Sequence, residues 1–430
     1  MKKSMYANII RKGDERLIHN SLFGGIVKAS CSNSKTFLDR IDEESFFEIN
    51  DNENFHQTLK DMRMIVEDDV NESNLANFYY ESNQRRELFI ILFVTKQCNF
   101  RCVYCSQKHE DKIMTYETYD DILDAIEKLI DAYGYRIVRL SFFGGEPLLE
   151  YDKICKFSEE VNDLAERKNV IYVAGMTTNG YLLTSDRLEK LVGVKIIDYQ
   201  ITLDGLKEKH DKARLLVGKN IAHEISNWEV IMKNLINAKS SSLGFSFLIR
   251  TNFDDEIISS STEFVEHLSN NFKNDPRFMF HFEAVKNLSG SSDVDFDLVD
   301  DEVACVHEIA SKADKAGLKV YSTQTVVRSL GMSCYATSYD SFAIDYDGTL
   351  MKCTVHVDSE KNRIGSVSDK KISINDHLMA LWTSPGLSEK CKSCRILPIC
   401  YNKKCPIAGS DDNPCERLAN MYENALKMLI

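Results

Sequence analysis

The chain has 430 residues, of which 43% are hydrophobic and 28% charged, and its formal net charge is −13. This length allows two or three domains with their own cores. The acidic balance argues against nucleic acid as a partner, because phosphate backbones bind basic surfaces. The longest apolar run, at 88–94, is too short to cross a bilayer, and the basic N-terminus lacks the apolar segment of a signal peptide. We therefore expect a cytoplasmic protein that binds neither membranes nor nucleic acid.

Residues 1–84 are expected to form a first domain. The segments SKTFLDRIDEESFFEI (34–49) and NENFHQTLKDMRMI (52–65) have helical spacing of apolar residues. MIVEDDVNESN (64–74) predicts a short strand and then the start of a helix. This mixture fits a small winged-helix-like module. An irregular extension packed on the next domain is the other interpretation.

From 85 to 300, candidate strands alternate with helical segments. Alternation of this kind predicts an α/β fold with a parallel sheet and right-handed crossovers, and six such units form a partial or full TIM-like barrel. In barrels the site is built at the C-terminal ends of the strands. The six candidate strands are ELFIILFVT, RIVRLSFF, NVIYVAGMTT, VKIIDYQITL, GFSFLIRTN and RFMFHFEAV.

A bridging helix–strand segment at 301–330 leads to a last domain at 331–430. That domain is rich in loops and cysteines and has little periodicity, so metal centres are expected to hold it together. The chain has 13 cysteines, and in the cytoplasm such residues act as metal ligands more often than as disulfides. Three of them, Cys31, Cys155 and Cys305, are isolated and are interpreted as ordinary thiols.

The segment TKQCNFRCVYCSQ places Cys98, Cys102 and Cys105 directly after the first strand of the predicted barrel. Structural zinc sites take four ligands, whereas a [4Fe–4S] cluster held by three thiolates leaves one iron free for a substrate or cofactor. A zinc site completed by a distant residue and three packed thiols remain as alternatives.

The sequence CNFRCVYC resembles the signature of radical S-adenosylmethionine (SAM) enzymes. In that family the free iron of a [4Fe–4S] cluster binds SAM, and an electron from the cluster cleaves SAM to a 5′-deoxyadenosyl radical. The resemblance implies that Cys98, Cys102 and Cys105 hold this cluster. It also implies that Tyr104, the aromatic residue before the third cysteine, contacts the adenine.

Further motifs of the same family follow at predicted strand ends, in FFGGEPLL, TTNG, ITLDG and LIRTN. By resemblance, Gly144, Gly145 and Glu146 bind the amino group of SAM. Two glycines let a backbone approach a ligand closely, and a carboxylate suits an ammonium group. Thr202 is expected to face the ribose or carboxylate of SAM, and Arg250 to bind its carboxylate.

The cysteines after residue 331 resemble the SPASM extension of radical SAM enzymes that modify peptides, which holds up to two auxiliary [4Fe–4S] clusters. Seven thiols cannot fill two sites that each take four. The pattern of that extension assigns auxiliary cluster I to Cys334, Cys353 and Cys405, and auxiliary cluster II to Cys391, Cys394, Cys400 and Cys415. The C-x2-C pair in this region is also compatible with a zinc ribbon.

Asp340 stands where members with a complete first auxiliary cluster have a further cysteine. It is expected either to supply an oxygen ligand or to leave an iron open for a substrate thiolate, which gives it a catalytic role. The alternative is that Asp340 only hydrogen-bonds a loop backbone. Anaerobic sulfatase-maturing members have a catalytic Asp directly after the equivalent of Cys353, where this chain has Thr354.

The resemblance implies a maturase that installs a thioether, from a cysteine sulfur to a carbon, in a ribosomally synthesised precursor peptide, as sactipeptide and ranthipeptide maturases do. Residues 1–84 would recognise the leader of the precursor by adding a strand to a sheet edge. The expected partners are this precursor and an external electron donor of the flavodoxin or ferredoxin type. Alternatives are carbon–carbon crosslinking, oxidation as in sulfatase maturation, and a zinc-ribbon interaction protein without enzymatic activity.

Overall fold

The computed structural model describes nine segments of the chain, which form two compact units. Unit 1 comprises Met1–Gln84, Ser322–Thr337 and Leu381–Ile430, and unit 2 comprises Arg85–Tyr321 and Ser338–Ala380. No helix within the described segments is long and apolar enough to span a membrane. The segments are 1–43, 53–82, 87–217, 226–285, 302–321, 334–383, 388–401, 405–407 and 414–430.

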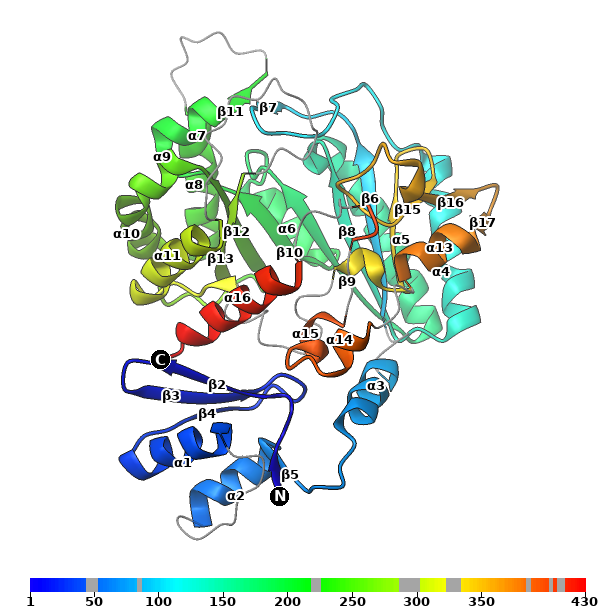
Figure 1. The fold of residues 1–430 in the computed structure, drawn as a ribbon. Helices are drawn as coiled ribbons and strands as arrows, with labels where there is room; N and C mark the ends of the chain where they lie inside the picture. Colours follow the sequence, from blue (N-terminus) through cyan, green and yellow to red (C-terminus); the bar gives the residue numbers. More distant parts are fainter. Residues whose placement is uncertain are drawn as a thin grey trace. The chain divides into compact units, whose positions relative to one another are not determined.

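Unit 2 is built on a ten-stranded sheet with the order β13-β12-β10-β9-β8-β6-β14-β15-β16-β17 (Figure 1). Its first six strands are mutually parallel and correspond to the six strands predicted from the sequence. The predicted α/β fold with an open, partial barrel is therefore confirmed. These strands are β6 (Glu87–Thr95), β8 (Ile137–Gly144), β9 (Ile171–Thr178), β10 (Ile196–Thr202), β12 (Ser246–Phe253) and β13 (Phe278–Ala284).

Helices flank the parallel strands (Figure 1), and the burial of alternate strand residues explains why. In β8 every second side chain is fully buried, as Val138, Leu140 and Phe142 show. The first helix, α4, begins after the N-cap Thr115 and ends at Gly134 in a left-handed conformation. The helices are α4 (Tyr116–Tyr133), η1 (Pro147–Glu150), α5 (Tyr151–Lys168), α6 (Ser185–Gly193), α7 (Lys207–Ala213), α8 (Asn227–Ser240), α9 (Asp255–Ser259), α10 (Ser261–Phe272) and α11 (Glu302–Lys315).

The sheet continues beyond β6 into residues that the sequence analysis placed in a loop-rich domain. Strand β14 runs parallel to β6, with Ser341 opposite Phe89, and β15, β16 and β17 follow antiparallel. At the other edge Val320, from the predicted bridging segment, pairs with Phe280 of β13. The added elements are β14 (Ser341–Ile344), β15 (Thr349–Met351), η3 (Glu360–Asn362), β16 (Arg363–Ser368), β17 (Lys371–Ile374) and α13 (Asp376–Thr383).

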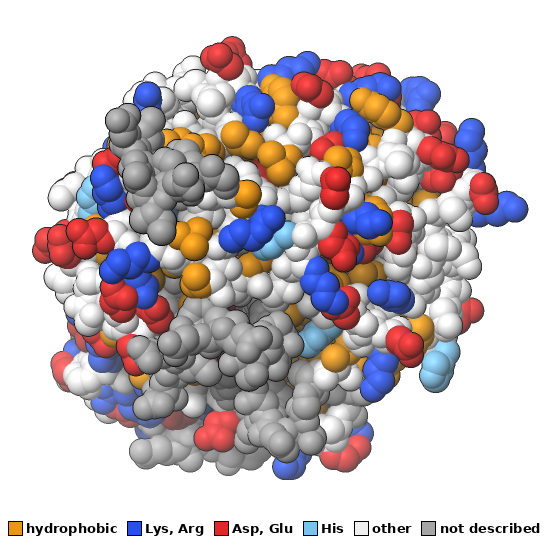
Figure 2. Space-filling model, turned by 90° about the horizontal axis from the view of Figure 1, so that it is seen from above, with side chains coloured by type: hydrophobic (Ala, Val, Ile, Leu, Met, Phe, Trp, Pro, Cys, Tyr) orange, Lys and Arg blue, Asp and Glu red, His pale blue; other side chains and the backbone are white. Residues whose placement is uncertain are grey.

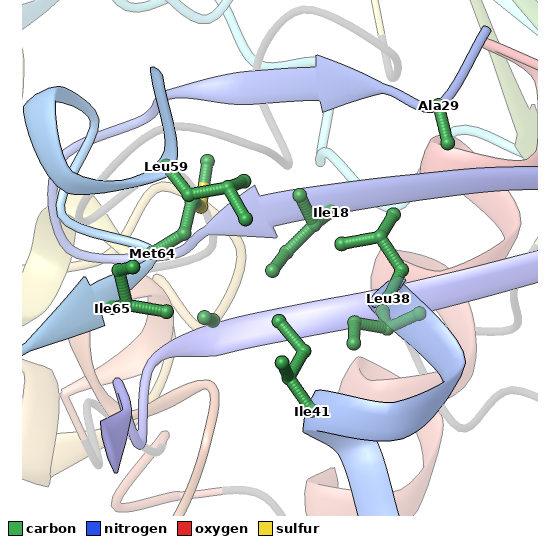
Figure 3. Close-up of a cluster of buried hydrophobic side chains, with 9 residues drawn as sticks. Ile18, Ala29, Leu38, Ile41, Leu59, Met64 and Ile65 are labelled. Atoms are coloured by element: carbon green, nitrogen blue, oxygen red, sulfur yellow. The ribbon is translucent and has the colours of Figure 1, made fainter. Parts of the chain in front are cut away.

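Unit 1 contains a three-stranded antiparallel sheet, β2-β3-β4, and the short pair β1-β5. Its hydrophobic core joins Ile18 of β3 to Leu38 and Ile41 of α1, and to Leu59 and Met64 from the α2–β5 segment (Figure 3). The elements are β1 (Lys2–Lys3), β2 (Ala7–Lys12), β3 (Glu15–Asn20), β4 (Ile26–Lys28), α1 (Ser32–Glu43), α2 (Glu53–Asp61), β5 (Ile65–Val66), α3 (Glu72–Ser82), η2 (Tyr335–Thr337), α14 (Glu389–Lys392), α15 (Leu397–Cys400) and α16 (Pro414–Lys427).

The two ends of the chain share a second hydrophobic core in unit 1. Ile10 and Leu17 of the N-terminal sheet pack with Ile399, Tyr422 and Leu426 from α15 and α16. The side-chain oxygen of Tyr422 also lies 2.5 Å from Nδ1 of the buried His19. Residues 1–84 therefore form one core by themselves and share a second with C-terminal helices, and the region 331–430 is divided between the two units. Helix α16 itself was not expected from the sequence.

Acidic and basic side chains are interspersed on the face of the molecule shown in Figure 2, with hydrophobic side chains between them. Ion pairs form between exposed side chains, such as Lys108 with Asp358 at 3.0 Å. Exposed pairs of this kind contribute little to stability.

Candidate active site

A cavity of about 490 Å³ lies at the carboxyl ends of the parallel strands of unit 2. Its wall is formed by the ends of β8, β9, β10, β12 and β13 and by the segment 98–109 that follows β6. A cleft of this size suits a small-molecule ligand. Barrel folds build their sites at this edge of the sheet.

Cys98, Cys102 and Cys105 all line this cavity. A short antiparallel ribbon shapes the segment that carries them, because β7 (Phe100–Cys102) pairs with β11 (Arg214–Leu216). The backbone N–H of Cys105 donates to the carbonyl of Cys102 at 3.0 Å. The local motif and a strand from a distant part of the chain therefore place the three thiols together on one wall.

Burial raises the pKa of Cys98 to about 12 and also raises the pKa of Cys102. Without a cation these thiols stay protonated at neutral pH, and a metal would have to displace their protons. The described part of the chain holds no three His, Cys, Asp or Glu side chains grouped closely enough to hold a single metal ion. Three thiols face one cavity, with His109 Nε2 at 3.8 Å from the Cys105 sulfur. Thiolates are the ligands that iron–sulfur clusters take, so the three cysteines fit such a cluster.

Gly144 and Gly145 allow the end of β8 to approach the backbone that leads from β6 to Cys98. Gly144 has a φ of +129°, and a Cβ on it would lie 2.2 Å from the carbonyl oxygen of Thr95. A Cβ on Gly145 would lie 2.0 Å from the carbonyl oxygen of Gln97. The sequence analysis expected both glycines to make room for a ligand. They do line the cavity, but the close approach is to the chain itself.

The carboxylate of Glu146 is fully buried and bonded within the protein. It accepts hydrogen bonds from the Thr178 hydroxyl at 2.6 Å and from the backbone N–H groups of Asn179 at 2.8 Å and Leu148 at 3.0 Å. Burial raises its pKa, and these hydrogen bonds oppose the change. Glu146 thus ties the end of β8 to the end of β9, whereas the sequence analysis expected it to meet the amino group of SAM.

Thr202 and Arg250 lie side by side on adjacent strands, at the ends of β10 and β12, and both line the cavity. The Arg250 Nε donates to the Asn252 side-chain oxygen at 2.9 Å. Glu283, at the end of β13, brings an acidic side chain to the same cavity. The neighbouring strands β12 and β13 therefore bring a cation, Arg250, and a carboxylate, Glu283, to the cavity, which suits a ligand with both kinds of charge.

Tyr104 also lines the cavity, and its hydroxyl is the centre of a buried polar network. It accepts from Arg214 Nη1 at 2.7 Å and from Asn252 Nδ2 at 3.2 Å, and it donates to Asp204. The other carboxylate oxygen of Asp204 accepts the backbone N–H of Asn252 at 2.8 Å. The sequence motif indicates Tyr104 but not Asp204, which stands in the segment ITLDG, nor Arg214, for which no local signal exists.

The cysteines after residue 331 are divided between the units. Cys391, Cys394, Cys400 and Cys415, expected to hold auxiliary cluster II, all belong to unit 1. Cys391 and Cys394 pack against the core around Tyr6 and Leu397. The ligands expected for cluster I are spread over both units, with Cys334 and Cys405 in unit 1 and Cys353 and Asp340 in unit 2, and that assignment stays a prediction.

Asp340 is buried in unit 2, just before β14. Its Oδ1 accepts a hydrogen bond from the Tyr135 hydroxyl at 2.6 Å, and its carbonyl oxygen accepts the backbone N–H of Phe89 in β6 at 2.8 Å. The Phe89 contact helps to fix β14 beside β6, and the Tyr135 contact ties the start of β14 to the segment before β8. The partner of the carboxylate is thus a tyrosine side chain and not the loop backbone considered from the sequence, and the role of Asp340 at a cluster stays a prediction.

The family comparison agrees with the site. Residues 92–260 match the family model described as the Radical SAM superfamily. This segment is therefore similar to radical SAM domains. The cavity, the three cysteines and the glycine pair all belong to unit 2, and the matched segment contains every cysteine and glycine named for this site.

Two curated relatives are similar to this domain. A GTP 3′,8-cyclase of Clostridium perfringens (strain 13 / Type A) is 32% identical over 136 residues, which are 30% of this chain and 38% of the relative. A GTP 3′,8-cyclase of Sulfurimonas denitrificans is 28% identical over 210 residues, or 47% of this chain and 59% of the relative. The chain thus spans well under two thirds of the length of these relatives.

Solved structures resemble a larger part of the chain. Native anSMEcpe with bound AdoMet and Kp18Cys peptide has a TM-score of 0.58 at 16% identity, covering 80% of this chain and 98% of that one. Streptococcus suis SuiB has a TM-score of 0.52 at 14% identity, covering 96% of this chain and 99% of that one. At these identities the similarity establishes the fold.

Proposed function

We propose that this chain is a radical SAM enzyme that modifies a ribosomally synthesised precursor peptide. The observation that carries the proposal is the placement of Cys98, Cys102 and Cys105 on one cavity of a radical SAM domain, at the carboxyl ends of its parallel strands. A peptide substrate is supported by the two structural neighbours, since anSMEcpe is described with a bound peptide and SuiB with the precursor peptide SuiA.

The residues of the cavity would hold SAM in a defined orientation. The three cysteines would hold a [4Fe–4S] cluster, which in this family supplies the electron that cleaves SAM. Arg250 would bind the SAM carboxylate as a charge-assisted pair, and Thr202 would face the ribose or carboxylate. Tyr104 would lie against the adenine, with its hydroxyl fixed by Arg214 and Asp204.

Gly144, Gly145 and Glu146 would contribute to SAM binding by fixing the conformation of the backbone turn at the end of β8. The carboxylate oxygens of Glu146 already accept hydrogen bonds from Thr178, Asn179 and Leu148. We therefore assign the recognition of the SAM amino group to backbone carbonyls of this turn. The side chain of Glu146 would hold the turn in place.

The cofactor assignment is tested by replacing Cys98, Cys102 and Cys105 together with Ala. The anaerobically reconstituted parent should release 5′-deoxyadenosine from SAM and dithionite, whereas the triple variant should release none and still contain iron bound by the C-terminal cysteines. Cys155→Ala, which removes an isolated buried thiol, is the matched control and should behave as the parent. Zinc in place of iron in all samples would favour the zinc-ribbon alternative.

For the modification itself we propose a thioether between a cysteine sulfur and a carbon of the peptide. The support is the shortage of cysteines, because the seven thiols after residue 331 leave one ligand position of two auxiliary clusters without a thiolate. Incubation with a cysteine-containing peptide encoded beside the gene should lower the peptide mass by two hydrogen atoms and remove one alkylatable thiol. The same mass change with all thiols retained would point to carbon–carbon crosslinking or oxidation, and consumption of GTP would point to cyclase chemistry.

A variant at Asp340 tests whether a substrate thiolate binds at the predicted open position. Asp340→Cys would offer a competing thiolate, so crosslinking should fall while SAM cleavage continues. Crosslinking at the parental rate would exclude direct binding of the substrate sulfur there. The hydrogen bond from Tyr135 would then be the main role of Asp340.

We also propose that residues 1–84 bind the leader of the precursor at the edge strand β4. Within the described residues β4 pairs with β3 only, and Gly25 and Ala29, on either side of it, bond towards β3. Strand alternation then directs the N–H groups of Ile26 and Lys28 away from β3. Lys28→Pro should weaken binding of the leader peptide, and Lys28→Ala, which keeps the N–H group, should not. Equal binding by both variants would contradict the proposal.

A further inference from the structure

Arg214 places a buried positive charge beside the second of the three cysteines. It is the residue directly opposite Cys102 in the β7–β11 ribbon, and side chains of such a cross-strand pair lie on the same face. Its side chain is only 5% exposed and lines the cavity. An arginine keeps its charge at any physiological pH, so this is a permanent cation in the wall of the site.

The protein compensates this charge only in part. Arg214 Nη1 donates to the neutral Tyr104 hydroxyl at 2.7 Å and lies 3.6 Å from Asp204. Its Nε is buried and has no hydrogen-bond partner among the residues that the structure describes. Asp204, by contrast, also accepts hydrogen bonds from Tyr104 and from the backbone N–H of Asn252. A buried cation with an unused donor favours further negative charge nearby.

The backbone of the β7–β11 ribbon does not depend on a guanidinium at this position. The β7–β11 ribbon is held by backbone pairing of Phe100, Arg101 and Cys102 with residues 214–216. Arg214 also lies over the Phe100 ring, at 5.7 Å from its centroid, a contact that an apolar side chain could replace by packing. The guanidinium therefore contributes its charge next to the thiols, besides its contacts with Tyr104 and Asp204.

We propose that Arg214 raises the reduction potential of the iron–sulfur cluster held by Cys98, Cys102 and Cys105, and that Asp204 lowers it. This inference rests on the cofactor assignment of the proposed function. One-electron reduction, by a low-potential external donor, adds one negative charge to the site. A nearby cation stabilises the reduced state and a nearby anion destabilises it. These effects persist because the site has a low local dielectric.

The test is an EPR-monitored potentiometric titration of the full-length, anaerobically reconstituted protein. The relevant signal is the one that changes on addition of SAM and is missing from the triple Cys→Ala variant at positions 98, 102 and 105. Arg214→Gln should make the equilibrium constant for reduction at least tenfold smaller, a shift of about 59 mV to lower potential. Asp204→Asn should shift it by a similar amount to higher potential. Arg214→Lys keeps the charge and should stay within threefold of the parent.

Arg277→Gln is the matched control for the loss of a positive charge. Arg277 lies just before β13, at the end of the sheet away from the cavity, and is paired with Asp275 at 2.7 Å. Its replacement should leave the potential unchanged. Thermal unfolding of each variant without iron records any loss of stability separately from the potential.

Opposite shifts for Arg214→Gln and Asp204→Asn support the inference. An unchanged potential in an Arg214→Gln protein with parental iron content overturns it, and so do shifts of both variants in the same direction. Weaker SAM binding at an unchanged potential would make Arg214 a ligand of SAM, which also overturns it. If Arg214→Gln does not assemble the cluster, Asp204→Asn decides the matter. A parent that shows the SAM-responsive signal but leaves the peptide unmodified contradicts the proposed function and not this inference.

Discussion

Replacing Gly145 with Ala tests whether the glycine pair positions the cysteine segment. An added Cβ would lie 2.0 Å from the Gln97 carbonyl oxygen, and real Cβ atoms essentially never approach closer than 3.0 Å. The ends of β6 and β8 would therefore have to separate by about 1 Å. Cys98 follows Gln97 directly, so this separation would move the first of the three thiols.

The expected loss of folding free energy follows from the contacts that such a separation breaks. Gly145 N–H donates to the Thr95 carbonyl at 2.9 Å, and Glu146 N–H donates to the Gln97 carbonyl at 2.8 Å. Each hydrogen bond contributes about 1 kcal/mol net, and overpacking adds about 1–3 kcal/mol. The expected loss is about 3–5 kcal/mol, a large part of the about 5–15 kcal/mol that stabilises a typical domain.

Urea unfolding by circular dichroism and iron content per chain measure the two consequences. Gly145→Ala should unfold at lower urea and lose the SAM-responsive iron–sulfur signal. Gly193→Ala is the control, because a Cβ there meets no atom within 4 Å and φ is not left-handed. It should be neutral or gain up to about 1 kcal/mol. A Gly145→Ala protein with parental stability and parental iron would refute the steric argument.

Two further predictions concern buried titratable groups. His210 is fully buried, and its ring accepts the backbone N–H of Asp204 at 3.1 Å. Desolvation holds the pKa of His210 well below 6.5. The free energy of unfolding should therefore decrease as the pH drops below about 6.5, by up to about 1.4 kcal/mol per pH unit. His210→Gln should flatten this dependence in urea unfolding between pH 5 and 8, and an unaltered profile would exclude His210 as its source. Tyr135→Phe leaves the buried Asp340 carboxylate without its 2.6 Å donor and should cost about 1.5–3 kcal/mol. Tyr116→Phe, at an exposed tyrosine, should change the free energy of unfolding measured in urea by less than about 0.5 kcal/mol, and equal effects of the two would contradict the assigned bond.

The parallel part of the barrel was predictable because its signal is local. Each strand is a run of apolar residues, and the residues that face the helices are fully buried, such as Leu140 in β8 and Phe280 in β13. The strands β14–β17 gave no such signal. They are only three to six residues long, and β14 is fixed by pairing with β6, far away in the sequence. Long-range pairing of short strands is decided by tertiary structure.

The same distinction separates the predicted site residues from the missed ones. Cys98, Cys102 and Cys105 follow from a short spacing, which the sequence displays directly. Arg214 enters the site because β11 pairs with β7, and it meets the Tyr104 hydroxyl across 110 positions of the chain. No local pattern marks such a residue. Asp204 was missed although its motif was quoted, because its partners Tyr104 and Asn252 come from two other strand ends.

The residues of the recognised motifs act in two physically different groups. Gly145 packs closely on the Gln97 carbonyl, and Glu146 accepts hydrogen bonds from Leu148, Thr178 and Asn179, so their replacement should lower stability and cluster assembly together. Thr202 and Arg250 project into the cavity from β10 and β12, so their replacement should weaken SAM binding with little change in stability. Sequence resemblance treats both groups as ligand-binding residues, because it records which residues occur at a site and not which atoms they contact. Packing distances and hydrogen-bond partners add that information: they give Glu146 a structural role between β8 and β9, and its part in binding SAM stays a prediction.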